Sequence, residues 1–141
     1  MPKTRWTWRC DRVIPSDACL GRQILDELLE QMRVGQWCKH DIYSVRLAVE
    51  EALVNAIMHG NLCDADKHVQ IHCRLAAELV HVEIIDEGSG FDPAAIPDPT
   101  GSDRLECPSG RGVMLIKAFM SRVKYNTAGN RVVMEKERQG A

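Results

Sequence analysis

Apolar residues recur at helical spacing in two N-terminal segments. Leu20, Ile24 and Leu28 repeat every four positions, with further apolar neighbours beside them, as expected for an amphipathic helix lying on a sheet. Asp17, directly before this pattern, is a favoured N-cap residue, and the pattern is expected to break at Gly35. A second helix is predicted over residues 41–59, where the apolar stripe has the same spacing and ends before a glycine.

Strict alternation of apolar and polar residues predicts strands elsewhere in the chain. In the first such segment, alternation places Trp6, Trp8 and Cys10 on one face. The predicted strands are residues 5–10, 69–75, 80–84, 123–125 and 131–134, with tight turns near residues 77–78 and 128–130. The element order predicts a single domain over residues 1–141, an α/β (α+β) two-layer sandwich. Its sheet is expected to be mixed, mostly antiparallel, and covered on one face by three helices.

A long segment between these strands has no sustained period. Residues 91–109 contain four prolines, and a helix is expected to open after them at Gly110-Arg111-Gly112. Loops of this length inside a compact domain are usually functional, often as lids over a ligand. We therefore predict a lid over residues 91–109.

Composition narrows the classes of protein that fit. A chain of 141 residues with 45% hydrophobic residues can bury one ordinary core. The net charge is −2 and the basic residues are scattered, which argues against a nucleic-acid backbone as the main partner. No apolar run approaches the ~20 residues that span a bilayer, and residues 1–12 are polar and basic, so we expect a cytoplasmic protein without membrane contact.

The six cysteines are expected to be reduced thiols, because none forms a C-x-x-C pair and the core is large enough to fold without disulfides. Cys63, His68, His72 and Cys73 come nearest to a zinc-binding set. Their spacing falls outside the usual paired-ligand patterns, and neighbouring residues 72 and 73 point to opposite faces of a strand. They are better explained as ordinary strand and loop residues.

Three short motifs carry candidate chemistry, and each also has an ordinary structural interpretation. Glu51 and Asn55 are four residues apart and share a helix face, as many solvated pairs do. Asp86-Glu87-Gly88-Ser89-Gly90 follows an apolar strand, where glycines often supply the positive φ angles of a turn. The glycines of Gly110-Arg111-Gly112 can simply relieve crowding at a helix start.

The order of these three motifs resembles that of the GHKL ATPases, which include gyrase, MutL, heat-shock chaperone ATPase domains and histidine kinases. The resemblance covers nearly the whole chain. Within that superfamily, residues 51–60 and residues 110–116 are similar to the N-box and the last glycine box of the anti-sigma factor serine kinases. The resemblance implies a Bergerat ATP-binding fold, ATP and Mg²⁺ as ligands, and a homodimer. It also implies two partners: a STAS-domain anti-sigma-factor antagonist and a sigma factor.

Physical roles can be assigned beside that resemblance. The Asp86 carboxylate can accept a hydrogen bond from the exocyclic amine of adenine, while Gly88 and Gly90 allow the backbone to approach the base. The amide oxygen of Asn55 suits Mg²⁺, which prefers oxygen ligands. Glu51, one turn earlier, is suited to orient or deprotonate an attacking hydroxyl. Glu50 points about 100° away on the helix, so Glu51 is preferred.

The phosphates are expected at the start of the last helix. Gly110, Arg111 and Gly112 expose backbone N–H groups at a helix N-terminus, and Arg111 or Arg104 can add positive charge. One feature departs from the family, because Pro108 stands where some of these kinases have an arginine two residues before the glycine box.

Three functions fit these features. The first is a serine/threonine protein kinase that phosphorylates a STAS-type antagonist and binds a sigma factor. The second is a nucleotide-gated binding module without phosphotransfer. The third is a simple ATPase, since a glutamate at this position activates water in the hydrolysing branches of the superfamily.

Overall fold

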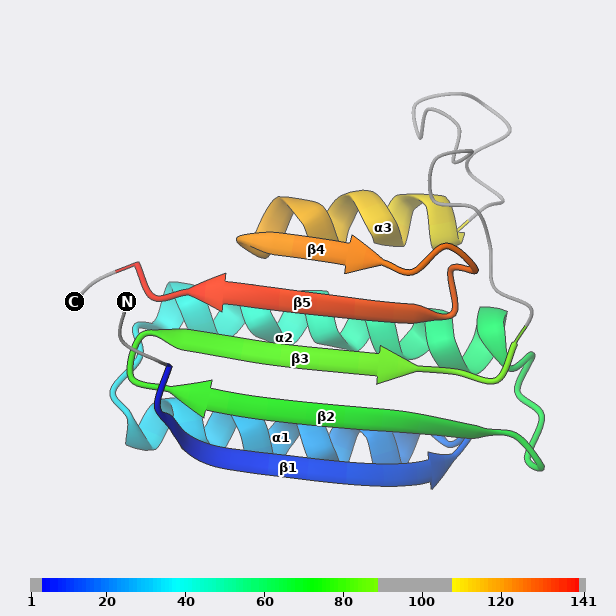
Figure 1. Cartoon of the computed structure of the whole chain (residues 1–141), viewed down its shortest axis with the longest axis horizontal. Helices are drawn as coiled ribbons and strands as arrows, with labels where there is room; N and C mark the ends of the chain where they lie inside the picture. Colours follow the sequence, from blue (N-terminus) through cyan, green and yellow to red (C-terminus); the bar gives the residue numbers. More distant parts are fainter. Residues whose placement is uncertain (1–3, 89–107, 140–141) are drawn as a thin grey trace.

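The computed structural model describes residues 4–88 and 108–139, which form two layers. One layer is a five-stranded sheet with the order β1-β2-β3-β5-β4 (Figure 1). The strands are β1 (Trp6–Pro15), β2 (His68–Ala76), β3 (Leu79–Ile85), β4 (Arg122–Tyr125) and β5 (Arg131–Glu137). All four neighbouring pairs of the described strands are antiparallel. The sheet that they form is therefore antiparallel, whereas a mixed, mostly antiparallel sheet was predicted. The two-layer α/β fold is confirmed.

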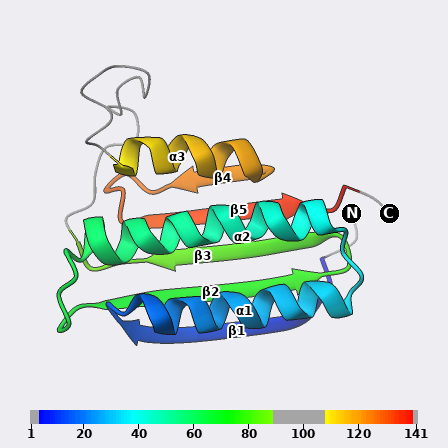
Figure 2. The same ribbon diagram turned by 180° about the vertical axis from the view of Figure 1, so that it is seen from behind.

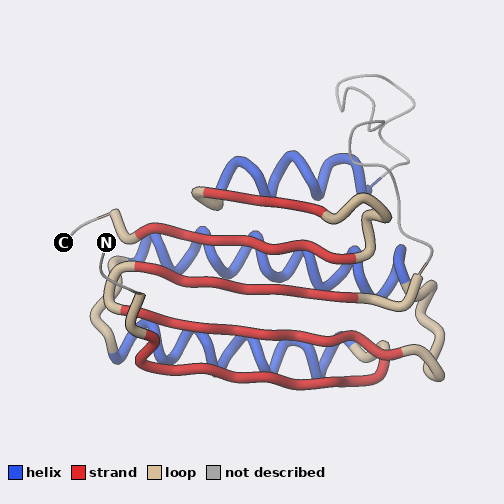
Figure 3. Tube along the Cα trace, viewed as in Figure 1, coloured by secondary structure: helices blue, strands red, loops and turns tan. Residues whose placement is uncertain are grey.

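The helices form the second layer. They are α1 (Ala18–Val34), α2 (Lys39–Val54), the π-helix η1 (Asn55–Gly60) that continues α2, and α3 (Pro108–Phe119). Figure 2 shows α1, α2 and α3 on the same face of the sheet, and Figure 3 shows the helices in blue behind the red strands. None of the helices in the described residues has the length and apolar composition needed to cross a membrane. The five cysteines in this part of the chain are free thiols.

The inner face of the sheet and the apolar stripes of the helices form one core. Leu28 of α1, Val45 of α2, and Val80 and Met134 of the sheet have no exposed surface. These residues occupy the apolar positions of the helical and alternating patterns in the sequence. Burial of these patterned faces is therefore what holds the two layers together.

The first helix has the predicted ends. The Asp17 side chain accepts hydrogen bonds from the backbone N–H groups of Cys19 at 2.8 Å and Leu20 at 3.4 Å, and Gly35 follows the last turn. The last helix begins two residues earlier than predicted, at Pro108 instead of Gly110. Proline is compatible with the first turn of a helix, because the N–H that it lacks has no intrahelical partner there.

The prediction that Trp6, Trp8 and Cys10 share one face of β1 is wrong for Trp6. The pairing of β1 with β2 shifts register between Trp6 and Trp8, as in a β-bulge. The Trp6 ring lies 6.0 Å from the ring of His81, whereas Trp8 packs against the core between the layers. One inserted residue therefore reverses the direction of the first tryptophan.

The second helix changes its hydrogen-bond pattern before it ends. The predicted continuous helix over residues 41–59 begins at Lys39 and becomes π-helical from Asn55. The backbone N–H of Asn61 accordingly donates to the carbonyl of Ala56, five residues back, at 2.9 Å. Single π-helical turns of this kind are frequent at functional sites.

Candidate functional site

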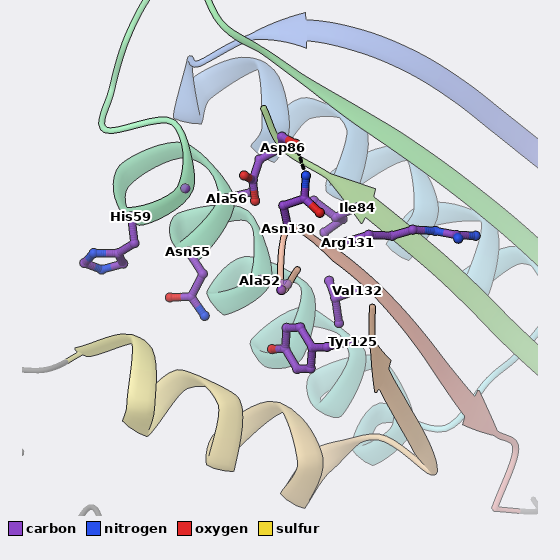
Figure 4. A pocket seen from close by; sticks show the side chains of 12 residues that line it. Ala52, Asn55, Ala56, His59, Ile84, Asp86, Tyr125, Asn130, Arg131 and Val132 are labelled. Atoms are coloured by element: carbon purple, nitrogen blue, oxygen red, sulfur yellow. Dashed lines mark hydrogen bonds between the residues drawn. The ribbon is translucent and has the colours of Figure 1, made fainter. Parts of the chain in front are cut away.

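A pocket lies at one end of the sandwich, where three segments meet. They are the end of α2 with η1, the end of β3, and the turn between β4 and β5. Figure 4 shows Asn55 and His59 on the helical side of this pocket, Asp86 and Asn130 on the sheet side, and Tyr125 near the α3 helix. The structure thus brings together two of the predicted site residues, Asn55 and Asp86, which are far apart in the sequence.

Asp86 is a buried carboxylate at the end of β3, only 9% exposed. Its Oδ1 accepts a hydrogen bond from the Gly88 N–H at 2.8 Å. Burial raises the pKa of Asp86, and the Gly88 hydrogen bond and the charge of Lys67 act in the opposite direction. The carboxylate is therefore held in one orientation in an environment with little competing water, which suits recognition of a hydrogen-bond donor.

The turn that carries Asp86 packs closely against the end of η1, and there is no room for a side chain at Gly60 or Gly88. A Cβ on Gly88 would lie 2.0 Å from the Gly60 carbonyl oxygen, and a Cβ on Gly60 would lie 2.4 Å from Cγ of Asp86. Among the described glycines, only Gly129 has a positive φ. Gly88 is thus required for close approach to Gly60, and the positive φ of an ordinary turn is not the reason for it.

Gly88→Ala is expected to lower the free energy of unfolding by about 1–3 kcal/mol, because the new methyl group overlaps backbone that cannot move freely. Gly21→Ala is the matched control. A Cβ on Gly21 would make an ordinary 3.4 Å contact with the flexible Leu53 side chain, inside a helix that alanine favours. Urea denaturation of the two variants measures the difference, and equal stabilities would contradict the tight packing at Gly88.

Asn55, the first residue of η1, has an unsatisfied side chain. Its amide nitrogen and oxygen are both buried, and neither has a hydrogen-bond partner in the part of the chain that the structure describes. Buried polar atoms are nearly always paired in proteins, so both atoms are available to a ligand. The free amide oxygen fits the oxygen preference of Mg²⁺.

Glu51 lies one turn before Asn55 on α2 and is half-buried. Burial raises the pKa of Glu51, and the charge of His59 partly opposes this effect. Burial, with a smaller contribution from the charge of Glu51, raises the pKa of Tyr125 to about 12. Glu51 is therefore near enough to interact electrostatically with two residues that line the pocket, although it does not line the pocket itself.

Not every predicted site residue belongs to the part of the chain that the structure describes. Gly90, Arg104 and residues 91–107 of the predicted lid lie outside the described residues. Gly110-Arg111-Gly112 belong to the first turns of α3, which packs against α2 and η1, but the side chain of Arg111 also lies outside the described part. The phosphate-binding roles given to these residues stay predictions.

The residues of the β4–β5 turn were predicted to form a turn but not to belong to the site. Asn130 binds the backbone of Asp86 twice, since its carbonyl accepts from the Asp86 N–H at 2.9 Å and its Nδ2 donates to the Asp86 carbonyl at 3.3 Å. The Asn126 Nδ2 in turn donates to the Asn130 Oδ1 at 2.7 Å. Two asparagines beside the glycine of this turn are the only signal in the sequence, and asparagine is common in turns for local reasons.

Comparison with known proteins identifies the family to which the chain belongs. The family described as "Histidine kinase-like ATPase domain" matches residues 14–136. The chain belongs to this family. The resemblance drawn from the three sequence motifs is thereby confirmed, and the site lies in a histidine kinase-like ATPase domain.

Two relatives illustrate the range of similar proteins. An anti-sigma F factor from Clostridium beijerinckii is 33% identical over 103 residues, which cover 69% of this chain and 71% of that protein. The serine-protein kinase RsbW from Oceanobacillus iheyensis is 30% identical over 99 residues, which cover 66% of this chain and 63% of that protein.

A solved structure has the same fold as this histidine kinase-like ATPase domain. It is the crystal structure of the RsbU and RsbW domains of Rv1364c from Mycobacterium tuberculosis, with a TM-score of 0.62 and 17% sequence identity. The similarity covers 96% of this chain and 34% of that chain. At this identity the likeness concerns the fold alone.

Proposed function

We propose that this chain is an ATP-dependent protein serine/threonine kinase that phosphorylates a STAS-type anti-sigma-factor antagonist and also binds a sigma factor. One observation carries the proposal: the buried Asp86 carboxylate and the unpaired Asn55 amide face one pocket, with Glu51 one helical turn away. The names of two relatives, an anti-sigma F factor and a serine-protein kinase, support both halves of this function. The protein acts in the cytoplasm, where sigma factors work.

The adenine of ATP is recognised on the sheet side of the pocket. The Asp86 carboxylate, fixed by Gly88 and by the backbone contacts of Asn130, accepts a hydrogen bond from the exocyclic amine. Guanine carries a carbonyl oxygen at that position, which cannot donate. Adenine is therefore the base that this site selects.

The triphosphate lies toward α3. The Asn55 oxygen is a ligand for Mg²⁺, which neutralises phosphate charge when it is bound. The free backbone N–H groups at the start of α3 and the guanidinium of Arg111 or Arg104 complete the phosphate site, because a helix N-terminus favours anions.

Glu51 is the general base of the transfer. It takes the proton from the hydroxyl of the substrate serine while the serine oxygen forms a bond to the γ-phosphorus and the bond to the bridging oxygen of ADP breaks. The raised pKa of Glu51 suits this role, because a carboxylate with a higher pKa is a stronger base.

The kinase function is tested by incubating the purified protein with γ-labelled ATP and a panel of purified STAS-domain proteins from the same organism. Transfer of label to a serine or threonine of one STAS protein is the expected result. ATP binding without transfer to any of them would favour a nucleotide-gated binding module. Release of labelled inorganic phosphate alone would favour a simple ATPase.

We also propose that the protein forms a homodimer with a contact near β1. Trp6 is 38% exposed on this edge strand of the sheet, and aromatic residues are enriched in interface cores. Sedimentation equilibrium over a wide range of concentration should give twice the mass of the chain. A monomer mass at every concentration would contradict the dimer.

A further inference from the structure

Asn61, the residue after η1, is a polar side chain with no exposed surface. Its Oδ1 accepts a hydrogen bond from the Glu87 N–H at 2.8 Å. Its Nδ2 donates to the Ser16 hydroxyl and to the His68 carbonyl, both at 3.0 Å. A single amide therefore connects the β1–α1 turn, the start of β2 and the turn that follows β3.

The contact with Glu87 bears on the pocket. Glu87 lies between Asp86, whose carboxylate faces the pocket, and Gly88, whose N–H orients that carboxylate. The Glu87 side chain also accepts a hydrogen bond from the backbone N–H of His68, so the turn is fastened a second time to the start of β2. With the Glu87 N–H held by Asn61, the peptide unit that joins residues 86 and 87 has a fixed orientation.

The backbone of Asn61 acts on the other wall of the pocket. Its N–H closes the π-helical turn by donating to the Ala56 carbonyl at 2.9 Å. The preceding residue, Gly60, is in contact with both Asp86 and Gly88. Asn61 thus couples η1, which begins with Asn55, to the turn that carries Asp86.

We propose that Asn61 is a positioning residue for nucleotide binding, which sets the Asp86 turn against η1 before the ligand arrives. This inference rests on the nucleotide site proposed above. A residue with a merely structural role would lower the stability of the fold when removed and leave the affinity of the folded protein for nucleotide unchanged. A positioning residue lowers that affinity as well.

Asn61→Ala and Ser16→Ala separate the two roles. The first leaves the Glu87 N–H without a partner, whereas the second removes hydroxyl contacts to Asn61 and to the Lys67 carbonyl on the side away from the pocket and keeps the Asn61–Glu87 bond. Isothermal titration with ADP and Mg²⁺, at a temperature where both variants are folded, should give an about tenfold weaker affinity for Asn61→Ala. Ser16→Ala should stay within about twofold of the wild type. Equal affinities for all three proteins, or an equal loss in both variants, would overturn the proposal.

Amide hydrogen exchange of the wild-type protein without nucleotide provides a test that does not depend on a variant that folds. The Glu87 N–H is expected to be protected to the degree of the neighbouring β3 amides, because its partner is buried. Exchange at the rate of an unstructured peptide would overturn the positioning role. The titration of the wild type tests the proposed function separately. If the Glu87 amide is protected but the protein binds no nucleotide, only the proposed function is contradicted.

Discussion

Glu51→Gln is expected to slow phosphoryl transfer to the STAS substrate by at least ~10²-fold while ATP affinity stays within a few-fold of the wild type. Serine hydroxyls are poor nucleophiles at neutral pH, so loss of the base affects the transfer step, whereas nucleotide binding needs no base. Single-turnover transfer from labelled ATP and equilibrium binding measure the two effects separately. Glu50→Gln is the matched control, since Glu50 makes an exposed ion pair with Arg46 on the same helix.

The pH dependence of the same reaction has a defined sign. Because burial raises the pKa of Glu51, the transfer rate should fall as the pH is lowered through that raised pKa, where the base becomes protonated. Because the folded state disfavours the ionised form of Glu51, the free energy of unfolding should fall as the pH rises from the ordinary pKa of a glutamate to the raised pKa of Glu51. Glu51→Gln should therefore fold at least as well as the wild type at neutral pH. A wild-type transfer rate in this variant would contradict the assignment of the base.

Asp86→Asn is expected to weaken ATP binding by about 10- to 100-fold, equivalent to roughly 1.5–3 kcal/mol. The substitution removes a charge-assisted acceptor and can present an amide donor to the donor of adenine. Asp66→Asn, at an exposed position in the loop before β2, makes the same change in net charge and should bind ATP normally. Unchanged ATP affinity in a folded Asp86→Asn protein would show that the adenine ring binds elsewhere.

The fold could be predicted from the sequence because its elements have strong local signals. Asp17 and Gly35 mark both ends of α1, and the alternating residues of β2 and β3 mark a hairpin. The Trp6 error has a physical cause, since a bulge depends on pairing with β2 and leaves no trace in the alternation of β1 itself. The π-helical end of α2 was missed for a similar reason, because its apolar spacing still fits an ordinary helix.

The sequence could predict those residues of the candidate site whose own side chains give a motif its chemistry. Asn55 and Asp86 could be singled out because their own side chains carry the chemistry proposed for the motif, and the structure places both on one pocket. Asn61 and Asn130 were missed because they act on the backbone of the Asp86 turn from segments distant in the sequence. Only the folded structure brings such supporting residues together.

In the proposed function, ATP binds in the pocket between Asn55 and Asp86. A titration of the ¹⁵N-labelled protein with Mg-ATP, followed by NMR, tests it most directly. Binding in this pocket should give saturable shifts of the backbone amides of Asp86, Gly88 and Asn130 and of the Asn55 side-chain amide. The signals of amides on the exposed face of α1 should not shift. An unchanged spectrum, or shifts confined to another surface, would contradict it.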